Sequence, residues 1–120
     1  AADIARVQAD LRLLMADIAV VSGAPGFLTP VHLQALEDDL RAWEGDAGGF
    51  RGFVAPGETV PGAHLHLART VIRRAERQIV ALAQAEGEAP PLILRYLNRL
   101  SSWVYALCLL VDAAPIKAVA

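Results

Sequence analysis

Apolar residues recur at every third or fourth position in four separate stretches of the chain, and glycine and proline divide these stretches. This spacing places the apolar side chains of each stretch on one face of a helix, which needs another helix to cover it. The alternation of apolar and polar residues that is typical of strands is absent. The sequence therefore predicts an all-α bundle of four helices, formed as a single domain over residues 1–120.

The helix boundaries follow from capping residues and breakers. The expected helices run from about Asp3 to Val21, from Thr29-Pro30 to the Gly45–Gly49 segment, from about Pro61 to Glu86, and from about Pro91 to Asp112. The inward-facing residues are expected to be Ile4, Val7, Leu11, Leu14, Ile18 and Val21; Leu33, Leu36, Leu40 and Trp43; Ala68, Ile72, Ala75 and Ile79; and Ile93, Leu97, Leu100, Val104, Leu107 and Val111. Glu37, Asp38 and Arg41 are expected to face outward.

Charge and composition narrow the classes of function. A net charge of −2 argues against a nucleic-acid binder that relies on a broad basic surface. The single cysteine, Cys108, allows no disulfide within the chain, so we expect a buried thiol and a reducing compartment. The longest uncharged apolar run near the C-terminus has about nine residues, half of a membrane span. No signal peptide is recognisable, because the first residues carry charges. These features predict a soluble, cytoplasmic protein.

Four arginines lie within nine positions of the third predicted helix. At 100° per residue, Arg69, Arg73 and Glu76 form one stripe beside the core face, with His66 at its edge. One interpretation is an exposed surface with an Arg73–Glu76 ion pair. The other is an anion site, because guanidinium groups bind phosphate oxygens bidentately and a nearby carboxylate can orient them or hold a metal ion. Periodicity alone leaves both open.

A second polar set lies on the fourth predicted helix. Arg95, Asn98, Arg99 and Ser102 gather on one side of the segment RYLNRLSS. Asparagine is a poor helix former and tends to have a partner there. The set is either a polar seam of the bundle or part of a binding site.

Three segments together resemble one family. They are RGFVAPG at Arg51–Gly57, HLHLARTVIRRAER at His64–Arg77 and RYLNRLS at Arg95–Ser101. They resemble the ATP:cob(I)alamin adenosyltransferases of the propanediol-utilisation type, which carry L-H-x-A-R-T-V-x-R-R-A-E-R and Y-L-N-R-L-S-D. The resemblance implies an antiparallel helical bundle that assembles as a homotrimer, with active sites between neighbouring subunits.

The resemblance also implies a reaction and roles for five residues. Cobalt(I) of a reduced corrinoid attacks the 5′ carbon of ATP, which gives adenosylcobalamin and triphosphate. Arg73 would bind the ATP phosphates, with Glu76 and Asn98 in the same nucleotide and Mg²⁺ site. Arg69 would form an intersubunit salt bridge, and Phe53 would lie against the lower face of the corrin and keep water off cobalt. A corrinoid reductase is an expected partner; nucleic acid and membrane are not.

The sequence departs from the family pattern in several places. The glycine- and threonine-rich ATP loop T-K-x-G-D-x-G-x-T and the helix after it, which carries the aspartate partner of Arg69, have no match. Glu58 replaces a glycine, and Ser102 replaces the aspartate of L-S-D. Two interpretations remain. The chain is part of a longer enzyme, or it is a shortened relative that acts as a corrinoid-binding subunit or a structural trimeric bundle.

Overall fold

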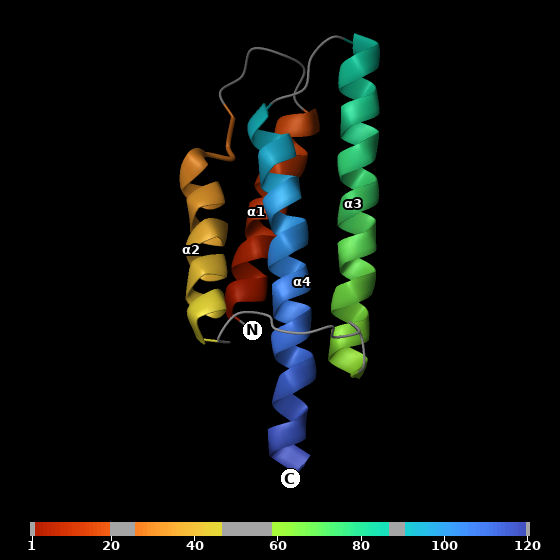
Figure 1. Cartoon of the computed structure of the whole chain (residues 1–120). Coiled ribbons are helices and arrows are strands. Elements are labelled where there is room, and N and C mark those ends of the chain that lie inside the picture. The colour runs from red at the N-terminus through yellow and green to blue at the C-terminus, as the bar shows by residue number, and fades with distance from the viewer. Residues whose placement is uncertain (1, 20–25, 47–58, 87–90, 120) are drawn as a thin grey trace.

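Four helices make up the computed structural model, which describes residues 2–19, 26–46, 59–86 and 91–119 (Figure 1). They are α1 (Ala2–Ala19), α2 (Pro30–Asp46), α3 (Val60–Glu86) and α4 (Pro91–Val119). Consecutive helices run in opposite directions, and the described ranges contain no strand. The predicted all-α bundle is therefore confirmed. Within those ranges, no helix combines the length and the apolar character that a membrane span requires.

Helix α4 is the centre of the bundle. It lies between α2 and α3 and contacts both of them (Figure 1). Of its predicted inward residues, Ile93, Leu97, Leu100 and Val104 are buried. Further α4 side chains that the periodicity did not single out are buried as well, notably Tyr96, Trp103 and Cys108. An amphipathic stripe identifies the face toward one neighbour, whereas α4 has neighbours on several sides.

Helix α1 is only partly covered. Val7 and Leu14 are buried as expected, but Ile4 and Ile18 are exposed, which corrects the predicted inward stripe. Periodicity shows which residues share a face; it does not show how far a neighbouring helix covers that face. The remaining predicted member, Val21, lies outside the described residues.

The start of α2 confirms the predicted place of Pro30. The backbone N–H of Thr29 donates to Nδ1 of His32 at 2.9 Å, and Pro30 is the first helical residue. Leu33 and Leu36 are buried, as the pattern indicates. The helix ends at Asp46, within the predicted glycine-rich break.

The two tryptophans of the chain meet in the bundle. Their ring centroids lie 5.1 Å apart, and Trp103 is buried while Trp43 packs partly buried against the core. The indole N–H of Trp103 donates to Asp39 of α2 at 3.0 Å, so the polar tip of this buried ring has a partner. The pair joins the faces of α2 and α4.

Helix α3 has two apolar faces. Ile72, Ala75 and Ile79 are partly covered, as predicted, but Ala68 is exposed, which corrects its predicted place in the core. A second stripe, which we call the outer stripe, spans about 60° of the helix circumference at 100° per residue. It consists of the exposed residues Val60, Leu67, Val71 and Leu82.

The bounds of the last two helices differ from expectation, by one residue at the start of α3 and by seven residues at the end of α4. Helix α3 begins at Val60, one residue before the predicted start. Helix α4 continues past the predicted end at Asp112 to Val119, and so runs through Pro115. Proline is unfavourable inside a helix, but several alanines, the best helix formers, surround it.

Candidate functional site

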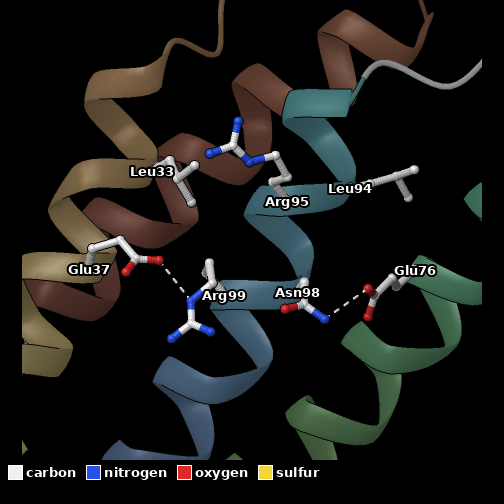
Figure 2. A pocket seen from close by; sticks show the side chains of 7 residues that line it. All are labelled: Leu33, Glu37, Glu76, Leu94, Arg95, Asn98 and Arg99. Atoms are coloured by element: carbon white, nitrogen blue, oxygen red, sulfur yellow. Dashed lines mark hydrogen bonds and ion pairs between the residues drawn. The ribbon is translucent and has the colours of Figure 1, made fainter.

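A shallow pocket of about 270 Å³ lies across the face of α4, between α2 and α3 (Figure 2). Three helices supply its walls, so the pocket exists only in the assembled bundle. Its lining residues are Leu33 and Glu37 from α2, Glu76 from α3, and Leu94, Arg95, Asn98 and Arg99 from α4. Two apolar side chains and five polar ones therefore converge, so the pocket favours a polar or charged ligand.

One wall of the pocket joins two residues that the sequence assigned to a site. The side-chain amide of Asn98 donates to Oε2 of Glu76 at 3.3 Å (Figure 2). These residues are 22 positions apart and come from different helices. The amide leaves its carbonyl oxygen as an acceptor and holds the carboxylate on the pocket side.

The opposite wall contains an ion pair between α2 and α4. Nε of Arg99 lies 2.8 Å from Oε1 of Glu37, and both side chains are about 40% exposed. Glu37 was expected to face outward; it is half-buried and forms this pair. The pair neutralises part of the charge of the pocket and fixes the direction of Arg99.

Arg95 is the other cation of the pocket. It is exposed and forms no ion pair with any residue that the structure describes. Its guanidinium group is therefore available to an anionic ligand, in contrast to that of Arg99.

Two predicted residues of α3 do not line the pocket. Arg73 is exposed and lies three residues before Glu76 on the same stripe. Within the described chain it has no ion pair, including the alternative pair with Glu76. Arg69 is half-buried, and its guanidinium group lies over the ring of Tyr105, 5.0 Å from the centroid. Its Nε is buried and has no hydrogen-bond partner in the described ranges.

The structure thus brings together Glu76 and Asn98. Arg69 and Arg73 lie on the same stripe of α3 as Glu76 but do not line the pocket. The fifth candidate, Phe53, is not tested. Phe53 lies outside the described residues. The polar set Arg95, Asn98 and Arg99 was visible in the sequence, and all three line the pocket, whereas Ser102 does not. Leu33, Glu37 and Leu94 were not recognised as site residues. The only feature of the sequence that could have indicated Glu37 was Arg99 in RYLNRLS, because a half-buried arginine needs a carboxylate partner.

Comparisons with known proteins agree on one family. A sequence profile of the family described as Cobalamin adenosyltransferase matches residues 1–111. A corrinoid adenosyltransferase of Bacillus subtilis is 36% identical over 113 residues, which cover 93% of this chain and 58% of the relative. The corrinoid adenosyltransferase PduO of Citrobacter freundii is 34% identical over 105 residues, 84% of this chain and 31% of the relative.

A third relative has nearly the same identity and coverage as the first. A cobalamin adenosyltransferase of Cupriavidus metallidurans is 35% identical over 112 residues, which cover 90% of this chain and 57% of the relative. The chain thus spans between about a third and somewhat more than half of the length of these curated relatives.

Proposed function

The chain belongs to the cobalamin adenosyltransferase family, and from this membership we propose that it transfers the 5′-deoxyadenosyl group of ATP to the cobalt of a reduced corrinoid. Cobalt(I) supplies the electron pair of the new bond to the 5′ carbon. The bond from that carbon to the phosphate oxygen breaks, and triphosphate leaves with the bonding pair. The observation that carries the proposal is the pocket in which Glu76 and Asn98 meet beside two arginines.

Charge on the departing triphosphate is the main electrostatic problem of this reaction. Fixed cations near the leaving group stabilise the negative charge that develops there. Arg73 is exposed on α3, three residues before the pocket residue Glu76, and Arg95 lines the pocket without a carboxylate partner in the described chain. We assign Arg73 to the binding of the ATP phosphates, as the family motif implies. The positive charge of Arg95, which no carboxylate of the described chain pairs, supports an anionic ligand in the pocket.

The donor set of the pocket is suitable for Mg²⁺ bound together with ATP. Mg²⁺ is usually held by one or two carboxylates, waters and substrate phosphates. Glu76 provides a carboxylate that Asn98 orients. No group of three or more His, Cys, Asp or Glu side chains gathers anywhere in the described ranges, so phosphate oxygens would complete the coordination. The ion would neutralise charge on the triphosphate.

Two further roles come from the family motif. Phe53 would cover the lower face of the corrin, where an apolar ring excludes water and the lower ligand from cobalt. Arg69 would form a salt bridge to a neighbouring subunit. Arg69 forms no salt bridge within the described ranges, which supports a partner from another subunit.

A homotrimer with sites between subunits completes the proposal. The outer stripe of α3 supports it, since four large apolar side chains on one exposed helix face favour a covering partner. A corrinoid reductase is the expected source of the reduced substrate. The cytoplasmic location remains a prediction that rests on the single cysteine.

The test is formation of the cobalt–carbon bond by the full chain with chemically reduced cobalamin, ATP and Mg²⁺, followed by absorption spectroscopy. We expect Arg73→Ala and Asn98→Ala to lower kcat/KM by about a hundredfold, as removal of one transition-state contact does. Arg41→Ala is the control, because Arg41 is also an exposed helical arginine and lies outside the pocket. Wild-type turnover by Arg73→Ala contradicts its assignment, and no product from the unaltered chain contradicts the function.

A further inference from the structure

Two arginines of α4 extend from the same side of the helix into the pocket. Arg95 and Arg99 are four residues apart, so they share one helix face, and both line the pocket. Figure 2 shows both side chains on the side of α4 that faces α2, whereas Asn98 points to Glu76 on α3. Two guanidinium groups are therefore offered to the same wall.

Helix α2 presents a different residue to each arginine. Leu33 and Glu37 are also four residues apart, and α2 and α4 run in the same direction (Figure 1). Leu33 therefore lies level with Arg95, and Glu37 lies level with Arg99 (Figure 2). Glu37 pairs with Arg99, with Oε1 2.8 Å from Nε, whereas the side chain of Leu33 has no acceptor. One arginine is paired and the other, among the described residues, is not.

The carboxylates of the pocket balance its cations. Two arginines and two glutamates line it, so their formal charges cancel. Glu76 is held by Asn98 and is assigned to Mg²⁺, which leaves Glu37 to determine how much positive charge a ligand meets. Carboxylate and phosphate oxygens bind a guanidinium group in the same way, so a polyphosphate would compete with Glu37 for Arg99.

We propose that Glu37 limits the affinity of the pocket for polyphosphate: it holds Arg99, so that Arg95 is the pocket arginine that contacts the phosphate chain. The inference rests on the proposed function and adds a residue that regulates it. Triphosphate, the product, carries the same groups as the substrate. Tighter binding of both would not speed the reaction and would retain the product, so a counter-charge in the pocket favours release.

The experiment is a calorimetric titration of the full chain with inorganic triphosphate and Mg²⁺. For Glu37→Gln we expect Kd to fall about tenfold, the factor for one charged hydrogen bond gained. Titration with ATP should show the same shift, because the contact is to the phosphates. Damage to the fold weakens binding, so a gain of affinity separates this role from a structural one.

Double variants test whether the freed Arg99 causes the gain. Arg95→Ala should raise the Kd for triphosphate about tenfold. Arg95→Ala with Glu37→Gln should return to within about twofold of wild type, because Arg99 then takes over the phosphate contact. Glu37→Gln with Arg99→Ala removes the pair as a whole and should also stay within about twofold of wild type.

Asp38→Asn is the matched control for net charge. Asp38 is the next residue of α2, lies outside the pocket and pairs with its own arginine, Arg41, at 2.6 Å. Its replacement removes one negative charge and frees one arginine, as Glu37→Gln does, but on the exposed surface. We expect it to leave the Kd for triphosphate within about twofold of wild type, because exposed charges are screened.

Tighter binding in Glu37→Gln that requires Arg99 supports the inference. An unchanged or weaker Kd in Glu37→Gln, equal tightening by Asp38→Asn, tightening that persists without Arg99, or wild-type affinity in Arg95→Ala overturns it. So does a lack of triphosphate binding by the unaltered chain. None of these results touches the proposed function, which fails only if the unaltered chain forms no cobalt–carbon bond.

Discussion

At the scale of single residues, the bundle interior contains a polar contact that titration can probe. Tyr96 is fully buried and donates its hydroxyl hydrogen to Oδ2 of Asp10 at 2.9 Å, which links α4 to α1. Burial raises the pKa of Tyr96 above its ordinary value of 10.0, and the hydrogen bond to Asp10 raises it further. The neutral phenol is therefore the form that the fold requires.

Tyr96→Phe should destabilise the chain by about 1–2 kcal/mol, because Asp10 loses a donor in a buried position. The folded-state pKa of Tyr96 is higher than the unfolded one, so its contribution is complete below pH 10 and is lost as pH rises further. Urea unfolding from pH 7 to 11 should show a steeper alkaline loss in wild type than in Tyr96→Phe. Tyr105→Phe is the control at a half-buried ring. Parallel pH profiles for wild type and Tyr96→Phe would contradict this account.

Residue-level prediction succeeded where the chemistry lies within one short motif. Asn98 and Glu76 were selected from the motifs RYLNRLS and RRAER, and they do meet across two helices. Glu37 and Asp112 were missed as partners, because Glu37 pairs with Arg99 and Asp112 pairs with Thr59, both far away in the sequence. Helix periodicity contains no information on which surface charges face each other once helices pack.

At the scale of elements, the difference between α1 and α4 explains the errors in the predicted core. Both helices show an apolar stripe, but α4 has neighbours on several sides, whereas parts of the α1 stripe stay exposed. The type and order of the four helices were predictable from capping residues and breakers, whereas the end of α4 at Val119 was not. The burial of Tyr96 and Trp103 was not, because it depends on the central place of α4.

The leucines of α4 differ in how deeply they are buried, because some face the centre of the bundle and others face the pocket. Leu100 is fully buried, whereas Leu94 lies half-buried at the pocket. Leu100→Ala should lower the free energy of unfolding by about 2–5 kcal/mol, since it leaves a cavity among residues of other helices. Leu94→Ala should cost much less, because solvent reaches the site already. Thermal and urea unfolding measure both, and equal losses would show that α4 is not the core of the bundle.

At the scale of the whole molecule, the long α3 is covered on one side only. It packs on α4, and the outer stripe of Val60, Leu67, Val71 and Leu82 remains exposed. Helix α1 also exposes apolar side chains, with Met15 the most exposed of them. These two surfaces are alternative candidates for a subunit interface, and only the outer stripe belongs to the helix that carries Arg69 and Arg73.

Leu67→Glu places a charge in the middle of the outer stripe, where burial against a neighbouring subunit would require its desolvation. We expect it to convert a trimer into monomers in analytical ultracentrifugation, without loss of helical circular dichroism, since Leu67 contributes little to the core of its own chain. Adenosylation should fall with the trimer if, as proposed, the sites lie between subunits. Met15→Glu is the matched control: Met15 has 59% of its surface exposed, close to the 62% of Leu67, and should leave a trimer. Dissociation by Met15→Glu and not by Leu67→Glu would place the interface on α1 and disconnect it from the arginine helix.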